Sequence, residues 1–424
     1  MNRNIFKQKN EKNNIFFIFL FIFVFFIINF LVKSMAKAKT SNKSQNKKAK
    51  QTTVRIEHKP YPAAINKRLH QIRFNMNENK IDAAFISYLP NIRYLTNYSG
   101  SWAYMLITTD EIYFFTDDRY EEQVRTELYD LNNMRVHITR DVWKYIEDLG
   151  ITKTIKNIGI EQDHLSYAEG TEIRMKMNKL GIKFRPISDI VDLYTQAKSP
   201  EELECIKKSC NIAEDVFGYI LDVIRPGVSE LDIAVEIDYQ ARLRGSEGCA
   251  FDTIVTSGVR GALVHGQPSN KKIRRGDIVL MDFGCKVNGF CSDISRTVCC
   301  GKPKADQKKI YNILYNAMSA AIKEARAGMK GDYLDGIARK IIKDAGYGDY
   351  FKHSLGHGIG LICHERPTIT FRLYDQIIPK DVVLAIEPGI YLPDMFGMRV
   401  EDNVLIGHTK NIKLTNAPDT LIQV

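Results

Sequence analysis

The sequence lacks the cysteine spacing of a disulfide framework or a zinc-binding module. None of its eight cysteines forms a Cys-x-x-Cys pair. In a chain of 424 residues this pattern is typical of reduced, buried thiols in a cytosolic-type protein. Residues 62–196 also lack a glycine-rich phosphate-binding loop, which excludes the common nucleotide-binding motifs from that region.

The greater part of the chain has no net charge, although the whole sequence has a formal charge of +10. Residues 1–50 hold eleven of the 60 Lys and Arg residues and one of the 50 Asp and Glu residues. Positions 51–424 therefore carry 49 basic and 49 acidic residues, which gives no case for a nucleic-acid-binding surface there.

One long apolar run, residues 15–32, contains a single polar residue, Asn29. As a helix it would be about 27 Å long, enough to cross a bilayer. Its length favours an uncleaved anchor over a signal peptide, and seven lysines in residues 33–50 favour a cytoplasmic enzyme after it. A further interpretation is that Met35 starts the protein and that a basic, disordered tail follows. The sequence leaves these interpretations open.

Apolar strands alternate with helices in residues 61–197. The segments "IDAAFIS" and "EIYFFT" predict strands, and "RYEEQVRTEL" predicts an amphipathic helix. This alternation predicts a small α/β domain, with the apolar segment and tail before it as residues 1–60. A second domain is expected over residues 198–424.

The second domain begins with a strong helix signal. Ser199 is a suitable N-cap, Pro200 fits the first helical position, and Glu202 completes a capping box. Two similar segments, residues 224–234 and 325–338, each follow a long helical stretch and open another helix. This weak internal repeat indicates two similar halves of one domain.

Two acidic residues flank a predicted hairpin turn in "LMDFGCKVNGFCSDISRT", residues 280–297. The Asn-Gly pair favours a two-residue turn, which sets Gly284 opposite Asp293. Because side chains alternate along a strand, Asp282 and Asp293 then share a face, with Cβ atoms within roughly 8 Å. Two such charges are unfavourable in a half-buried sheet unless a cation lies between them. The alternative is that one of them faces water in a bulged turn.

Further ligand candidates lie closer to the C-terminus. The segment "HSLGHGIGLICHERP" places His353, His357 and His364 beside glycines that allow close backbone approach. Glu387 ends one apolar strand, and Glu401 is expected on the next. A glutamate within an apolar strand costs several kcal/mol unless it is paired or ligated.

Four carboxylates and one imidazole are thus available as a ligand set: Asp282, Asp293, His357, Glu387 and Glu401. The set is too acidic for a structural zinc site, which prefers thiolate and imidazole. It suits two divalent ions of the manganese, cobalt or iron type, bridged by carboxylates and a water. Two such ions would neutralise the four carboxylates.

The order of these residues, with the phrases "MDFGCKVNGFCSDISRT", "HSLGHGIGL", "AIEPGIY" and "GMRVEDNVLI", resembles the pita-bread metallopeptidases. Within them the chain is similar to aminopeptidase P and prolidase, which cleave Xaa-Pro bonds. Residues 62–196 resemble the creatinase/prolidase N-terminal domain, notably in "FFTDDRY". The resemblance implies an α+β fold, with a pita-bread catalytic domain preceded by a smaller α/β domain.

The same resemblance implies roles for the ligand set. Asp282 would chelate one metal ion, and Asp293 and Glu401 would bridge the two ions. His357 and Glu387 would complete the shell of the other ion. Manganese is the expected metal, with cobalt, iron and zinc as alternatives.

The resemblance also implies a set of catalytic residues around the metals. His265, His353 and His364 match outer histidines that line the substrate pocket and stabilise the tetrahedral intermediate. Glu387 would carry the proton from the bridging water to the leaving nitrogen, and Arg399 matches an arginine beside the last ligand. The chain departs from its relatives at Ile362 and Cys363, where we expect an effect on the pocket shape and not on the metals.

The expected activity is hydrolysis of the Xaa-Pro bond at peptide N-termini by a metal-bridged hydroxide. The motif "FFTDDRY" favours aminopeptidase P, and the alternatives are a prolidase acting on Xaa-Pro dipeptides or a non-catalytic pita-bread peptide-binding protein. The intact ligand set argues against the non-catalytic protein and against the metal-free creatine-type amidinohydrolases. The N-terminal domain argues against methionine aminopeptidase.

The resemblance further implies partners, and the cysteines and the charge distribution indicate a location and exclude nucleic acid. The expected partners are peptides with proline at the second position and a second copy of the chain in a homodimer, without nucleic acid. The expected location is cytoplasmic, with membrane anchoring through residues 15–32 as the open alternative.

Overall fold

The structure is a computed structural model that describes residues 53–424. The apolar segment at 15–32, for which a membrane anchor was one interpretation, lies outside the described residues. Within residues 53–424, no helix combines the length and the apolar character that crossing a bilayer requires.

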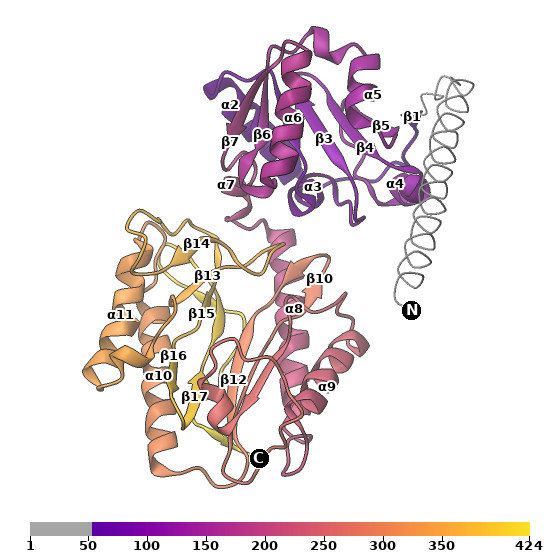
Figure 1. Cartoon of the computed structure of the whole chain (residues 1–424). Coiled ribbons are helices and arrows are strands. Elements are labelled where there is room, and N and C mark those ends of the chain that lie inside the picture. The colour runs from indigo at the N-terminus through magenta and orange to yellow at the C-terminus, as the bar shows by residue number, and fades with distance from the viewer. Residues whose placement is uncertain (1–52) are drawn as a thin grey trace, which may run out of the picture. The chain divides into compact units, whose positions relative to one another are not determined.

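The N-terminal domain is built on a seven-stranded mixed sheet with the strand order β1-β5-β4-β3-β2-β6-β7 (Figure 1). Its strands are β1 (Thr53–Val54), β2 (Ala83–Ile86), β3 (Tyr104–Thr108), β4 (Ile112–Thr116), β5 (Met134–Ile138), β6 (Asn157–Glu161) and β7 (Lys183–Ile187). The two predicted strands appear as β2 and β4. The short strand β1 pairs with β5, so the sheet includes residues from the range 1–60.

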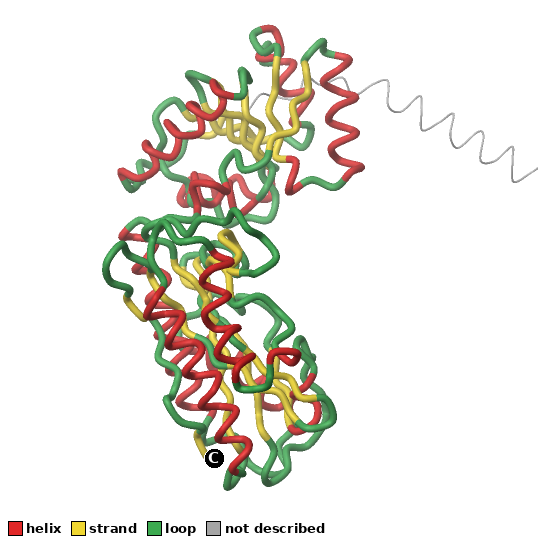
Figure 2. The backbone as a smooth tube through the Cα atoms, turned by 90° about the vertical axis from the view of Figure 1, so that its left-hand side faces the viewer, coloured by secondary structure: helices red, strands yellow, loops and turns green. Residues whose placement is uncertain are grey.

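Helices cover both faces of this sheet (Figure 2). They are α2 (Ala63–Glu78), α3 (Leu89–Thr96), α4 (Glu121–Glu127), α5 (Val142–Asp148), α6 (Tyr167–Lys179) and α7 (Asp192–Thr195). In β2, Ala84 and Ile86 pack with α2 and α3, whereas Phe85 packs with α5 and α6. Both faces are therefore buried, which explains why β2 is apolar at all four of its positions. Helix α4 is the amphipathic helix that the sequence predicts.

The C-terminal domain contains two pairs of helices. They are α8 (Pro200–Ile220), α9 (Glu230–Leu243), α10 (Ala305–Glu324) and α11 (Gly331–Asp344). Helix α8 has the predicted capping box, in which Ser199 N–H donates to Glu202 at 2.7 Å and Glu202 N–H donates to Ser199 Oγ at 3.3 Å. Helices α9 and α11 begin within the two repeated segments, each after a long helix, as predicted.

The helix pairs pack on two main sheets, with the orders β20-β12-β9-β8 and β14-β13-β15-β18-β19. The strands are β8 (Ile254–Ser257), β9 (Ile278–Phe283), β12 (Ile294–Cys299), β13 (Gly356–Gly358), β14 (Glu365–Ile369), β15 (Val383–Ile386), β18 (Asp402–Leu405), β19 (Ile412–Lys413) and β20 (Ile422–Gln423). Two hairpins, β10 (Lys286–Val287) with β11 (Phe290–Cys291) and β16 (Gly389–Leu392) with β17 (Phe396–Arg399), complete the domain. Apolar cores form between α8 and α9 and the first sheet, and between α10 and α11 and the second.

The predicted hairpin forms with the predicted register. Val287 pairs with Phe290 across the turn, and Asn288 and Gly289 both have positive φ angles, of 49° and 81°. The same register continues from β10–β11 into β9–β12, which places Gly284 opposite Asp293. The two acidic side chains therefore lie on the same face of the sheet.

All eight cysteines are free, and six of them are buried. The predicted state of reduced, buried thiols is confirmed for those six, whereas Cys205 and Cys249 are half-buried.

Candidate metal centre

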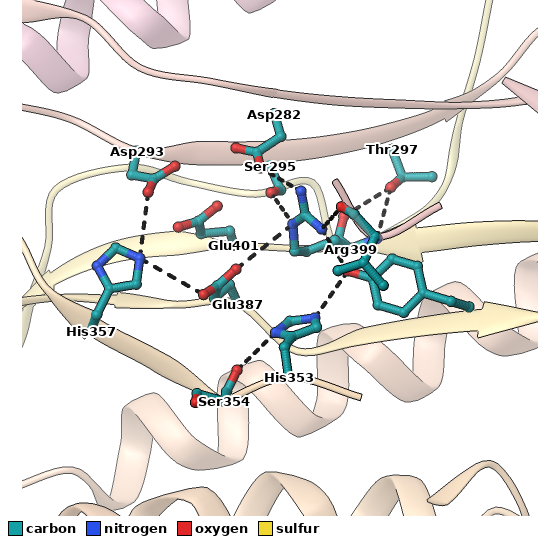
Figure 3. A network of polar contacts seen from close by, with 12 residues as sticks. Asp282, Asp293, Ser295, Thr297, His353, Ser354, His357, Glu387, Arg399 and Glu401 are labelled. Atoms are coloured by element: carbon teal, nitrogen blue, oxygen red, sulfur yellow. Dashed lines mark hydrogen bonds and ion pairs between the residues drawn. The ribbon is translucent and has the colours of Figure 1, made fainter. Parts of the chain in front are cut away.

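Five separate segments of the C-terminal domain bring the predicted ligand residues together (Figure 3). Asp282 lies on β9, and Asp293 immediately precedes β12. His357 is the middle residue of β13, and Glu387 directly follows β15. Glu401 lies between β17 and β18, one residue before the strand on which we expected it.

The ligand atoms form two groups, and within each group all the atoms lie within 4.8 Å of one another. One group contains Asp282, Asp293 and Glu401, and the other contains Asp293, His357 and His364. Asp293 belongs to both groups, so its carboxylate lies between two candidate ion positions. The sequence assigned His364 to the outer shell, but the structure places its ring 4.3 Å from the ring of His357.

The protonation of His357 shows that a cation fits this centre. Its Nδ1 is 3.1 Å from the carbonyl oxygen of Gly358, which accepts only, so Nδ1 carries the proton. Burial lowers the pKa of His357 to about 4, so the ring is neutral and Nε2 has a free lone pair. This lone pair faces Asp293 Oδ2 at 3.6 Å and Glu387 Oε1 at 3.7 Å. Three electron-rich atoms face each other there, which is the arrangement that a metal ion stabilises.

The charge of the carboxylates supports the same conclusion. Burial, with the neighbouring carboxylates, raises the pKa of Asp293 and Glu387 well above the usual range. Burial and the charge of Asp282 raise the pKa of Glu401 to about 8. Among the described residues, Asp282 Oδ1 and both carboxylate oxygens of Glu401 are buried without a hydrogen-bond partner. Buried oxygens of this kind are costly unless a ligand occupies the space between them.

Arg399 forms an ion pair with Asp282 and also lies near Glu387, with its Nε 3.8 Å from Glu387 Oε2. It is 2% exposed, pairs with Asp282, and donates from Nε to Ser295 Oγ at 2.6 Å. Its Nη1 donates to Tyr391 Oη at 2.5 Å. The guanidinium is thus held by several groups of the site.

His353 belongs to the same network. Its Nδ1 donates to the carbonyl oxygen of Ser354 at 2.8 Å, so its Nε2 accepts from the Tyr391 hydroxyl at 2.9 Å. Burial, with the nearby charge of Arg399, lowers the pKa of His353 to about 3 and keeps the ring neutral. Both ring nitrogens are occupied, so His353 has no free N–H for a reaction intermediate in this arrangement.

The centre opens into a cavity of about 560 Å³. The other two predicted outer histidines, His265 and His364, line this cavity and are exposed to it. Arg366 also lines it, with its side chain 48% exposed and Nη1 at 2.6 Å from Asp189. A small peptide has access to the carboxylates through this space.

Two glycines are required where His357 enters the centre. A Cβ atom on Gly356 would lie 1.9 Å from the carbonyl oxygen of Ala385, and one on Gly358 would lie 2.2 Å from that of Arg366. Strand β13 is therefore packed between its neighbours more closely than any side chain at these positions allows.

Three further residues of the site were not predicted to act in it: Ser295, Tyr391 and Asn403. Tyr391 lies in a segment that the sequence analysis singled out, but its contacts with His353 and Arg399 depend on strand pairing. Cys363 was expected to alter the pocket shape and not the metals. The structure places Cys363 Sγ 3.2 Å from Asp293 Oδ2, so its thiol also contacts a predicted metal ligand.

Comparison with known proteins agrees with this arrangement. The model of metallopeptidase family M24 matches residues 204–408, and that of the creatinase/prolidase N-terminal domain matches residues 68–193. The Xaa-Pro dipeptidase of Pyrococcus furiosus is 37% identical over 84% of this chain and 100% of its own length.

Solved structures show the same likeness. The structure of an Xaa-Pro dipeptidase from Bacillus anthracis has a TM-score of 0.78 at 35% identity, covering 85% of this chain and 100% of its own. That of an X-Pro aminopeptidase from Thermotoga maritima has a TM-score of 0.77 at 36% identity, covering 84% and 99%. The predicted fold class, a pita-bread domain preceded by a smaller domain, is confirmed. The chain belongs to metallopeptidase family M24 and is an enzyme of that family.

Proposed function

We propose that this enzyme is an Xaa-Pro dipeptidase that works with two divalent metal ions. The observation that carries the proposal is the convergence of four carboxylates and the His357 lone pair beside the cavity, which all of these residues except Glu401 line. The name of the Pyrococcus furiosus relative and that of the Bacillus anthracis structure support the dipeptidase reading over aminopeptidase P, which the sequence alone favoured.

The proposed ligands are Asp282, Asp293, His357, Glu387 and Glu401, with His364 within reach of the same centre. An oxygen-rich set with one or two imidazoles suits manganese, cobalt or iron, and manganese is the first metal to test. Bound divalent ions would supply Lewis acidity and a water that ionises near neutral pH.

The chain's own residues then act on the peptide. Glu387 is half-buried and lines the cavity, so its carboxylate is placed to take a proton and deliver it to the proline nitrogen. His364 is neutral, because burial lowers its pKa, and its ring N–H is available to the carbonyl oxygen that becomes negative. His353, Tyr391 and Arg399 form a chain that fixes Asp282, so we assign His353 a positioning role.

Arg366 supports a preference for dipeptides. In an Xaa-Pro dipeptide the free carboxylate directly follows the proline, whereas in a longer peptide this position is a neutral amide. Arg366 lines the cavity with a half-exposed guanidinium, and its pairing with Asp189 holds one end in place. A guanidinium so placed recognises a carboxylate by charge-assisted hydrogen bonds.

The test is a substrate panel on protein whose metal content is measured after purification. We expect Mn²⁺-loaded protein to hydrolyse Xaa-Pro dipeptides faster than Xaa-Pro-Yaa tripeptides, and to leave Xaa-Ala dipeptides uncleaved. Faster cleavage of the tripeptides would assign aminopeptidase P instead. Full activity after removal of all metal, or no cleavage of any Xaa-Pro peptide, would refute a metal-dependent Xaa-Pro peptidase.

We also propose a reducing, cytoplasmic location and a homodimer. The free state of all eight cysteines supports the location, because an oxidising compartment favours disulfides. The resemblance to the pita-bread metallopeptidases, which implies a homodimer, supports the dimer, and light scattering of the purified protein tests it.

A further inference from the structure

Asp293 lies in a break between two strands. Strand β11 ends at Cys291 and β12 begins at Ile294, so Asp293 belongs to neither. The preceding residue, Ser292, donates its N–H to the carbonyl oxygen of Cys285 across the hairpin. Because backbone groups alternate in direction along an antiparallel strand, the N–H and C=O of Asp293 point to the opposite side.

The side chain of Asn403 takes the place of a strand on that side. Its Oδ1 accepts from the N–H of Asp293 at 3.0 Å, and its Nδ2 donates to the carbonyl oxygen of Asp293. The thiol of Cys210 donates to the same Oδ1 at 3.4 Å, which fixes the orientation of the amide. One side chain thus satisfies both backbone groups of a buried ligand residue.

Asn403 is itself held rigidly. It is fully buried on β18, its N–H donates to Thr415 Oγ1 at 2.9 Å, and its carbonyl oxygen accepts from Leu414 N–H at 2.8 Å. Asn403 pairs with Ala385 of β15 as well. The position of the amide is therefore set by the second sheet, whereas Asp293 adjoins the first.

Cys363 holds the side chain of Asp293. Its Sγ lies 3.2 Å from Asp293 Oδ2 and is 5% exposed, so the thiol donates a hydrogen bond within the site. The backbone of Asp293 is held by Asn403 and one carboxylate oxygen by Cys363. Asp293 is the residue shared by the two groups of ligand atoms, so its placement affects both.

We propose that Asn403, with Cys363, is a positioning residue that sets the affinity of the centre for its metal ions. The inference rests on the proposed function, since it concerns the same centre. Without the amide, two buried backbone groups would lack partners and Asp293 would shift to find new ones. Loss of a group that orients a metal ligand typically weakens metal affinity about 10- to 100-fold.

The experiment compares Asn403→Ala with Asn411→Ala. The Asn411 amide also bridges backbone groups, accepting from Gly407 N–H at 3.2 Å and donating to Ile322 O at 2.8 Å, but it contacts no ligand residue. Mn²⁺ binding is measured by equilibrium dialysis with metal analysis, and the stability of the metal-free proteins by urea unfolding. We expect both variants to lose stability, and only Asn403→Ala to weaken Mn²⁺ binding, by about tenfold or more.

A second pair of variants keeps the test valid if Asn403→Ala does not fold. Cys363→Ser retains a hydrogen-bond donor and should bind Mn²⁺ as the wild type does, whereas Cys363→Val should bind it more weakly. Wild-type affinity in both Asn403→Ala and Cys363→Val, or in Cys363→Val alone if Asn403→Ala does not fold, would overturn this inference while leaving the proposed function intact. A wild-type protein that binds no Mn²⁺ would overturn the proposed function and this inference with it.

Discussion

Glu387 stands between His357 and Arg399, at 3.7 Å and 3.8 Å from their nearest nitrogens. It is the one predicted ligand that is only half-buried, so its carboxylate adjoins both the metals and the substrate. The Glu387→Gln variant keeps the shape of the side chain but cannot take up the proton. We expect it to fold and to lose about a hundredfold or more in kcat, as for other general acid–base residues.

The readouts are kcat on an Xaa-Pro dipeptide and the circular dichroism of the variant. Glu204→Gln serves as the control, because Glu204 is an exposed acid on α8 whose one ion pair among residues 53–424 is with Lys207. A Glu387→Gln enzyme with near wild-type kcat would remove this residue from the proton transfer.

Substitution of Arg366 should change the preference for a substrate with a free carboxylate without changing the hydrolysis step itself. Removing its charge by Arg366→Gln should lower kcat/KM for an Xaa-Pro dipeptide about tenfold, which is the loss of one partly exposed charge-assisted hydrogen bond. The corresponding Xaa-Pro amide lacks the carboxylate and should be cleaved by the variant and the wild type at similar rates. An equal loss of kcat/KM on both substrates would show that Arg366 does not bind the carboxylate.

Strand β13 carries His357 into the centre, and its packing limits what the strand tolerates. A Gly356→Ala side chain would meet the carbonyl oxygen of Ala385 at 1.9 Å and push β13 away from β15. We expect a loss of about 1–3 kcal/mol in the free energy of unfolding, together with weaker metal binding.

Gly336 offers a matched control, for which we expect an increase in the free energy of unfolding instead of a decrease. It lies in the interior of α11, and a Cβ atom there meets nothing within 4 Å. Gly336→Ala should stabilise the protein by about 0.5–1 kcal/mol, because alanine loses less conformational freedom in a helix. Urea unfolding of the two variants tests both signs, and a tolerated Gly356→Ala would show that β13 can move.

The strands also show what the sequence could predict. The face shared by Asp282 and Asp293 was predictable, because one Asn-Gly turn and the two-residue alternation fix the register over a few residues. The cap of α8 was predictable for the same reason, since Ser199 and Glu202 interact within one turn.

Contacts between distant segments were not predictable in this way. The bond between Asn403 and Asp293 spans 110 residues, and that between Cys363 and Asp293 spans 70. Each depends on how two sheets approach each other, which periodicity and turn residues do not specify. The approach of His364 to His357 escaped prediction because the register between β13 and β14 shifts after His357, where Arg366 and Pro367 of β14 are passed over.

The stability of the metal-free protein should depend on pH through its carboxylate cluster. The folded protein holds a proton on Glu401 up to a pKa of about 8, raised by burial and Asp282, whereas the unfolded chain releases it near its ordinary value of 4.5. The folded state therefore binds more protons between these values, so stability falls as pH rises. Below about pH 6.5 the histidines have the opposite effect, and stability rises with pH. The reason is that burial lowers the pKa of His357 to about 4 and that of His353 to about 3 in the folded state, so the unfolded chain binds more protons there.

Between pH 6.5 and pH 8 the unfolded histidines lose their remaining protons, so the opposing contribution of His357 and His353 fades, and Glu365, whose pKa burial raises to about 7, contributes in the same direction as the cluster. In the presence of a chelator, the free energy of unfolding measured in urea should decrease across this window. Mn²⁺ replaces the protons, so its stabilising effect should be larger at pH 8 than at pH 6.5, and about 2.7 kcal/mol when free Mn²⁺ is a hundredfold above its Kd. Glu401→Gln removes one of the titrating groups, so the free energy of unfolding of the chelated protein should change less with pH. A chelated wild type whose stability does not change between pH 6.5 and pH 8 would contradict a cluster of carboxylates that lacks its cation, because such a cluster cannot ionise without cost.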